Sequence, residues 1–179
     1  MTRPAPNAAY YQQASERLTF RPLTSADIEA WIPFFTNNSG LRFVGAHADD
    51  LSPEEKSLKW IERQIERAAK VEFGQLAVCR KDTGEFIGVG GIISRDLDGA
   101  CELEITYSLL QAHQGNGFAT ELARHFMEYA QQHLHISSLI SLIHVDNTAS
   151  MNVATKNGLR RERQIEFMEM PVYIYRIQC

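Results

Sequence analysis

The seven residues from position 114 to position 120 place two glycines between a strand-like and a helix-like stretch. They read Gln114, Gly115, Asn116, Gly117, Phe118, Ala119 and Thr120. The unpaired backbone N–H groups of a first helical turn converge on one point, and the helix dipole adds positive potential there. Because Gly115 and Gly117 permit positive φ and carry no Cβ, this loop can bind a phosphate. A simple turn is the alternative, and the motif alone leaves both interpretations open.

Two common nucleotide sites are excluded at this loop. The chain has no G-x-x-x-x-G-K-[ST] pattern, so it is not a P-loop protein. A dinucleotide fold requires a third glycine where Thr120 stands, and it requires repeated strand–helix–strand units that do not follow here. The three cysteines and six histidines show no metal-ligand spacing, so we expect no metal site.

The composition is that of an ordinary globular protein of one domain, with 179 residues of which 44% are hydrophobic and 22% charged. The net charge of −4 argues against nucleic acid as a partner. No apolar stretch is long enough to span a bilayer, and residues 1–15 lack the apolar region of a secretory signal. We therefore expect a cytoplasmic protein without a membrane partner, with a flexible arm over residues 1–15 and a single domain over residues 16–179.

Hydrophobic periodicity and turn residues predict a chain that mixes strands and helices. Strands are predicted at residues 16–21, 73–80, 85–94, 100–110, 139–145, 159–168 and 172–177, the last two being separated near Pro171. Helices are predicted through Ile28 and Trp31, from Ser52 with its capping pattern to about residue 68, after the glycine loop, and at residues 148–157. Residues 139–145 are nearly all apolar, which favours a strand buried on both faces and parallel to a neighbour.

Three blocks of the sequence together carry a family resemblance. The first is residues 16–23, Glu-Arg-Leu-Thr-Phe-Arg-Pro-Leu, with Asp27 just after it. The second surrounds the glycine loop from Tyr107 to Ala130, and the third runs from Val145 to Leu159. In this order and spacing the blocks resemble the GNAT superfamily of N-acetyltransferases, particularly its branch related to ribosomal-protein N-terminal alanine acetyltransferases.

The resemblance implies an α+β fold, in which a mostly antiparallel mixed sheet has helices on both faces and a central pair of parallel strands that splay apart. Here those strands end near Leu109 and Val145. The resemblance also implies acetyl-CoA as co-substrate, with its pantetheine arm between the splayed strands. Leu109 and Leu110 are accordingly assigned to the pantetheine and residues 114–120 to the pyrophosphate. Asn147 and Asn152 are assigned to further coenzyme contacts, with a simple helix cap as the alternative for Asn147.

Transfer of an acetyl group to an amine requires removal of a proton from the amine and reprotonation of the departing thiolate. Glu104, in the strand that leads to the splay, is the candidate base, and an exposed carboxylate that only solvates the strand is the alternative. Many superfamily members use a tyrosine as the acid where this chain has Ala154. The resemblance points instead to Ser150 as donor, and a helix-start hydroxyl bonded to nearby backbone is the alternative.

These features predict an N-acetyltransferase that moves an acetyl group from acetyl-CoA to a primary amine by direct attack in a ternary complex. The amine could belong to a protein N-terminus, an amino acid or a small molecule, and the enzyme could be a monomer or a homodimer. The alternative is a non-catalytic acyl-CoA-binding sensor or assembly module. Aromatic residues are expected to form a wall beside the acceptor or to pack in the core: Trp31, Phe34, Phe35, Phe43 and Tyr173. Asp49, Asp50 and Glu102 would suit a cationic acceptor, or they only solvate the surface.

Overall fold

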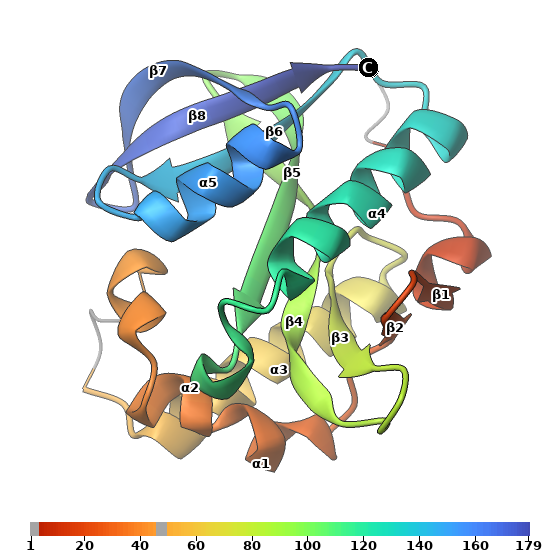
Figure 1. Cartoon of the computed structure of the whole chain (residues 1–179), viewed down its shortest axis with the longest axis vertical. Coiled ribbons are helices and arrows are strands. Elements are labelled where there is room, and N and C mark those ends of the chain that lie inside the picture. The colour runs from red at the N-terminus through yellow and green to blue at the C-terminus, as the bar shows by residue number, and fades with distance from the viewer. Residues whose placement is uncertain (1–3, 46–49) are drawn as a thin grey trace.

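The computed structural model describes residues 4–45 and 50–179, and its centre is one mixed sheet of eight strands in the order β1-β2-β3-β4-β5-β6-β8-β7 (Figure 1). The strands are β1 (Gln13–Ala14), β2 (Leu18–Arg21), β3 (Gln75–Arg80), β4 (Phe86–Leu97), β5 (Ala100–Leu109), β6 (Ser138–His144), β7 (Arg160–Phe167) and β8 (Met170–Gln178). The helices are α1 (Asp27–Trp31), α2 (Pro33–Thr36), α3 (Pro53–Ala69), α4 (Phe118–His133) and α5 (Thr148–Lys156). Short 3-10 turns cover Ala8–Tyr11, Ser39–Phe43 and Gln111–His113.

Helices cover both faces of the sheet, as the sequence predicts. Figure 1 shows α4 and α5 in front of the strands and α3 behind them. One apolar core lies under α4, where Leu122 and Phe126 are fully buried. The other lies under the first helices, where Trp31 and Ile61 are fully buried. Helix α3 begins at Ser52 with the predicted capping box, because the Ser52 hydroxyl and the Glu55 carboxylate each accept a backbone N–H of the other residue.

The two central strands β5 and β6 run parallel and separate, which confirms the predicted splay. Their register contains a single pair, Glu104 with Ile140. Strand β5 instead pairs with β4 along its whole length, and β6 pairs with β8 from Ser138 to His144. The Ser141 hydroxyl adds one link by donating to the Ile105 carbonyl oxygen at 2.8 Å. Beyond these contacts each strand keeps its own outer partner, so their carboxyl ends diverge.

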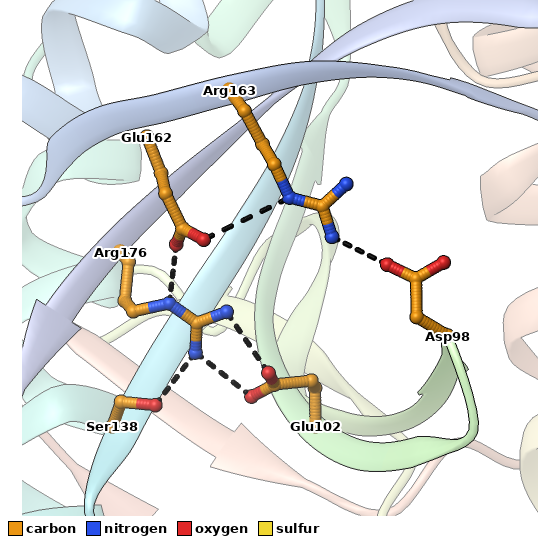
Figure 2. Close-up of polar contacts among 6 residues, drawn as sticks. All are labelled: Asp98, Glu102, Ser138, Glu162, Arg163 and Arg176. Atoms are coloured by element: carbon orange, nitrogen blue, oxygen red, sulfur yellow. Dashed lines mark hydrogen bonds and ion pairs between the residues drawn. The ribbon is translucent and has the colours of Figure 1, made fainter.

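A charged network joins the strands at the end opposite the divergence (Figure 2). The Arg176 guanidinium of β8 donates to the Glu102 carboxylate of β5 at 2.9 and 3.0 Å and to the Ser138 hydroxyl of β6 at 2.7 Å. It also donates to the Glu162 carboxylate of β7. Because this contact to Glu102 is bidentate, it fixes direction as well as distance. The network holds β5 against β6 at their first residues, so the gap opens only toward their last ones.

The N-terminal segment differs from the expected flexible arm, because residues 7–14 pack against the domain. Tyr10 is fully buried, and its hydroxyl donates to the Gly74 carbonyl oxygen at 2.6 Å and accepts from the Ile92 N–H at 2.8 Å. A Cβ at Gly91 would lie 2.5 Å from that hydroxyl, so glycine makes the room for it. The expectation rested on the low apolar content of the segment, and one anchoring aromatic residue overrides it.

The break between the last two strands also differs from the prediction, which placed it near Pro171. The chain turns at Met168 and Glu169, whose φ values are 51° and 61°, and Pro171 lies inside β8 as its second residue. Proline is tolerated near the start of a strand, because few ladder hydrogen bonds are lost there.

Candidate functional site

Two pockets meet where β5 and β6 diverge. The first, which we call the loop pocket, has a volume of about 310 Å³ and lies against the glycine loop and α5. The second, which we call the α3 pocket, has a volume of about 240 Å³ and lies between α3, β4, β5, β6 and the β7–β8 turn. The residues that line both are Phe43, Val44, Tyr107, Ser108, Asn147 and Ser150. Two molecules bound in these pockets would therefore face each other across the splay.

The glycine loop leaves the N-terminus of α4 open to the loop pocket. Gly115 and Gly117 have φ values of 78° and 80°, as predicted for this loop. No side chain caps α4, whereas Ser52 caps α3 and Asn147 caps α5. The first helical hydrogen bond runs from Glu121 N–H to the Gly117 carbonyl oxygen. The N–H groups of residues 118–120 therefore precede that bond, and these residues line the pocket, which is the arrangement of an anion site.

Arg17, which the sequence reasoning did not single out, lies against this loop. Its Nη1 donates to the Asn116 carbonyl oxygen at 3.1 Å, and its Nε pairs with the Glu121 carboxylate at 2.6 Å. Its guanidinium also lies over the Phe118 ring, 4.6 Å from the centroid. The residue belongs to the first of the three sequence blocks, but nothing in that block alone shows that it reaches position 116.

The side chain of Gln114 turns toward the end of β5. Its Nε2 donates to the Leu109 carbonyl oxygen at 3.0 Å and to Asn38 Oδ1 at 3.1 Å. Asn38, also missed by the sequence reasoning, donates to the same carbonyl at 2.8 Å and accepts from the Gly40 N–H. These bonds hold together the segment that follows α2, the end of β5 and the glycine loop, so the side chain of Gln114 supports the loop.

The backbone of β5 exposes alternate residues to the splay. The Leu110 N–H donates to the Ile87 carbonyl oxygen of β4 at 2.9 Å, and Leu110 is not among the described residues that line the loop pocket. Successive residues direct their backbone groups to opposite neighbours, so those of Leu109 and Tyr107 face β6. The structure thus brings Leu109 to the pocket but not Leu110, and it adds Tyr107.

The start of α5 forms the opposite wall. Asn147 caps the helix by accepting from the Ser150 N–H at 3.1 Å, so it has the helix-cap role given as its alternative in the sequence analysis. It also lines both pockets. The Tyr107 hydroxyl donates to the Ser150 carbonyl oxygen at 3.1 Å, and burial raises the pKa of Tyr107 well above its usual value. A side-chain hydrogen bond with Ser150 opposes this rise in the pKa of Tyr107. Asn152 is exposed at the rim of the loop pocket, whereas Ala154 is buried in the core.

Glu104 lies inside the α3 pocket, with only 5% of the residue exposed. One carboxylate oxygen accepts from Arg95 Nε at 2.5 Å, and the other faces the Leu142 N–H at 3.4 Å. Burial raises the pKa of this carboxyl and Arg95 opposes the shift, leaving the pKa above its usual value. The alternative of an exposed strand carboxylate is therefore wrong for Glu104. Glu102 is held by Arg176 and does not line either pocket in the described part of the chain.

Most of the expected aromatic wall belongs to the core instead. Phe43 lines both pockets and Phe34 touches the loop pocket, but Trp31 and Phe35 pack with Trp60 behind the sheet. Tyr173 stacks against the Arg161 guanidinium.

The expected acidic surface does not form at the α3 pocket. Asp49 lies outside the described residues, and Asp50 is not among the described residues that line the pocket. Three arginines line it instead: Arg63, Arg67 and Arg95.

Residues 4–45 and 50–179 contain no group of histidine, cysteine, aspartate or glutamate side chains that could hold a metal ion. Nor does any helix in these ranges have the length and apolar character needed to cross a membrane.

The sequence profile described as "Acetyltransferase (GNAT) domain" matches residues 17–160, which is most of the chain. The chain belongs to the GNAT acetyltransferase family. This GNAT acetyltransferase is 34% identical over 95 residues to the uncharacterized protein YkkB of Bacillus subtilis, a match that spans 53% of the chain and about half, 55%, of YkkB.

Among solved structures, this GNAT acetyltransferase is similar to the acetyltransferase from Agrobacterium tumefaciens strain C58, with a TM-score of 0.77 and 26% identity. The match covers 98% of this chain and 99% of that one. Its fold is also that of RimL, a ribosomal L7/L12 alpha-N-protein acetyltransferase solved in complex with coenzyme A, with a TM-score of 0.71, 20% identity and coverage of 93% and 96%. The profile match gives this chain an acetyltransferase domain of the GNAT family, whose co-substrate is acetyl-CoA. The uncapped α4 and the gap between β5 and β6 suit a phosphate-bearing, extended molecule.

Proposed function

We propose that this GNAT acetyltransferase moves an acetyl group from acetyl-CoA to a primary amine by direct attack in a ternary complex. The observation that carries the proposal is the meeting of the two pockets at shared residues, among them Tyr107, Asn147 and Ser150. The loop pocket takes the coenzyme and the α3 pocket takes the amine. Holding both reactants in one geometry supplies much of the acceleration, because the attack becomes effectively unimolecular.

The coenzyme contacts of this proposal come from backbone groups. The first-turn N–H groups of Phe118, Ala119 and Thr120, with Gly115 and Gly117, bind the pyrophosphate, and the Arg17 guanidinium beside the loop adds positive charge. The Leu109 N–H and the splay-facing backbone of Tyr107 bind the amides of the pantetheine as an added strand would, while Asn38 and Gln114 occupy the Leu109 carbonyl. Asn147 and Asn152 line the same pocket from α5.

Glu104 acts as the base in this proposal. It lies in the acceptor pocket and its raised pKa brings it closer to the pKa of an amine acceptor. A positioned base contributes about 10²–10⁴-fold to such a reaction. The Arg95 Nε and the Leu142 N–H contact one carboxylate oxygen each and fix the orientation of the group within the pocket.

Ser150 acts as the proton donor to the thiolate, because it lies where the two pockets meet. Tyr107 holds this turn of α5 through its bond to the Ser150 carbonyl. We expect Ser150→Ala to lower kcat about 10-fold or more while the Kd for CoA changes less than about twofold. Steady-state kinetics and calorimetry check this. Full turnover in the variant would leave protonation of the thiolate to water.

The second candidate is a non-catalytic acyl-CoA-binding module, and the alanine at position 154, where many relatives use a tyrosine acid, favours it. An amine screen separates the two. The protein is mixed with acetyl-CoA and a panel of amino acids, polyamines and short peptides, and CoA release and N-acetylated products are measured. Transfer to one acceptor class supports the enzyme, whereas tight acetyl-CoA binding with no transfer to any amine supports the module.

The cellular location and the class of acceptor are also part of the proposal. Cys79 and Cys179 are free thiols, which suits a reducing cytoplasm. RimL carries the name of a protein N-terminal acetyltransferase, so a protein N-terminus stays among the acceptors together with amino acids and small amines.

A further inference from the structure

One side of α3 faces the α3 pocket. Four residues spaced as i, i+3, i+4 and i+7 line it: Trp60, Arg63, Gln64 and Arg67. This spacing places side chains in a single stripe along a helix. Glu62 and Glu66 lie between them in the sequence and are not among the described residues that line the pocket. The helix therefore directs Arg63 and Arg67 toward the pocket and these two carboxylates elsewhere.

The stripe is held firmly in place. Trp60 Nε1 donates to Gln75 Oε1 at 2.8 Å, and Gln64 Oε1 accepts from the Gln75 N–H at 2.9 Å. Gln75 Nε2 in turn donates to the Thr106 hydroxyl of β5 at 3.2 Å. This chain of hydrogen bonds crosses from α3 through β3 to β5. The guanidinium groups are thus carried by a helix that is fixed relative to the strand bearing Glu104.

The charge balance of the pocket is positive. Arg63, Arg67 and Arg95 line it, and Glu104 is the single carboxylate among the described lining residues. Arg95 already pairs with that carboxylate. Arg63 is exposed and has no ion-pair partner in the part of the chain that the structure describes. Arg63 and Arg67 also stand one turn apart, where like charges weaken a helix. This arrangement is unfavourable for α3 alone and favourable for an anion bound beside it.

From this geometry we infer that the amine acceptor also carries an oxyanion group, a carboxylate or a phosphate, which binds the Arg63 side of the α3 pocket while the amine points to the junction of the pockets. The inference rests on the proposed function of amine acetylation. Guanidinium groups bind carboxylates and phosphates through paired, charge-assisted hydrogen bonds. The same positive surroundings disfavour the ammonium form of the acceptor, and the neutral amine is the form that attacks.

The test uses acceptors whose α-carboxyl groups are amidated and whose side chains differ in charge: glutamic acid α-amide, glutamine α-amide and lysine α-amide. O-phosphoserine α-amide and serine α-amide form a second pair that tests a phosphate. We expect kcat/KM to be highest for an acidic member and lowest for lysine amide. Arg63→Gln is expected to lower kcat/KM for the preferred acidic acceptor about 10-fold or more, as for loss of one charge-assisted hydrogen bond, and to leave glutamine amide and the KM for acetyl-CoA unchanged. The matched control is Arg124→Gln, an exposed arginine of α4 outside both pockets, which should behave as wild type. Arg63 is preferred to Arg95 because a change at Arg95 also removes the partner of Glu104.

A second readout does not depend on turnover. Calorimetry with the N-acetyl derivative of glutamic acid α-amide is expected to give about 10-fold weaker binding to Arg63→Gln than to the wild type or the control. Equal or better turnover of lysine amide, or equal losses by Arg63→Gln on all acceptors, would overturn the inference while leaving the amine acetyltransferase intact. Absence of transfer to any amine, with CoA still bound, would instead overturn the proposed function and this inference with it.

Discussion

Replacing Gly117 with glutamate is expected to weaken acetyl-CoA binding by at least about 100-fold, which corresponds to roughly 2.7 kcal/mol. The new carboxylate would stand at the N-terminus of α4, where the N–H groups of residues 118–120 are otherwise available to an anion. A Cβ at this position would also lie 3.4 Å from Arg17 Nη2, so the carboxylate can draw that guanidinium away from the site. Calorimetric titration with CoA measures the loss.

The control for this variant must share its backbone strain. Gly117 has a φ of 80°, where any residue with a Cβ is strained by about 1–3 kcal/mol. Gly99, in the β4–β5 turn, has the same φ of 80° and no atom within 4 Å of a built Cβ. Gly99→Glu should therefore lower the midpoint of thermal unfolding by a similar amount and leave CoA affinity unchanged. If the two variants had equal affinity for CoA, the assignment of the pyrophosphate to this loop would be wrong.

Replacing Glu104 with glutamine is expected to reduce kcat/KM most at low pH, by about 100-fold or more near pH 6. A base works only when it is deprotonated, so wild-type kcat/KM should rise with pH through the raised pKa of Glu104 and then level off. In the variant, only those acceptor molecules whose amine is already neutral can react. Its kcat/KM should therefore fall about tenfold for each pH unit below the pKa of the amine. Near and above the pKa of that amine the two enzymes should converge.

Glu102→Gln is the matched control, because Glu102 lies two residues earlier on β5 and carries the same charge. Its carboxylate binds Arg176 and not the pocket, so the change should lower stability and leave the shape of the pH–rate profile unaltered. If the Glu104 variant instead kept the wild-type profile, the base would have to be sought elsewhere, and His144, which lines the same pocket, is the next residue to replace.

The fold could be predicted from the sequence because its signals are local. The capping box at Ser52, the glycines of the loop and the apolar run at residues 139–145 each act within a few residues of the chain. The splayed sheet itself was implied by the resemblance to the GNAT superfamily. The buried Tyr10 was missed, since its partners at Gly74 and Ile92 are more than sixty residues away.

The candidate site could be predicted only in part, for the same reason. Strand alternation places Glu102 and Glu104 on one face of β5, and local pattern cannot separate them. Glu104 lies where β5 forms its single register pair with Ile140 of β6, beside the pocket, whereas the Glu102 carboxylate binds Arg176 of β8. Likewise, the spacing of Arg63 and Arg67 shows that they share a helix face, but only the packing of α3 shows which face meets the pocket.

Because β5 and β6 share a single register pair, the chain can be divided between them. Strands β1 to β5 with α4 come from residues up to 133, and β6 to β8 with α5 come from residues after 137. Each portion contains its own antiparallel pairs, and the seam between the strands holds one register pair, the Ser141 link and the Arg176 network. The glycine loop belongs to one portion and Ser150 to the other. A break in the 134–137 connection would thus yield two complementary fragments, and recovery of acetyl transfer would report their reassembly.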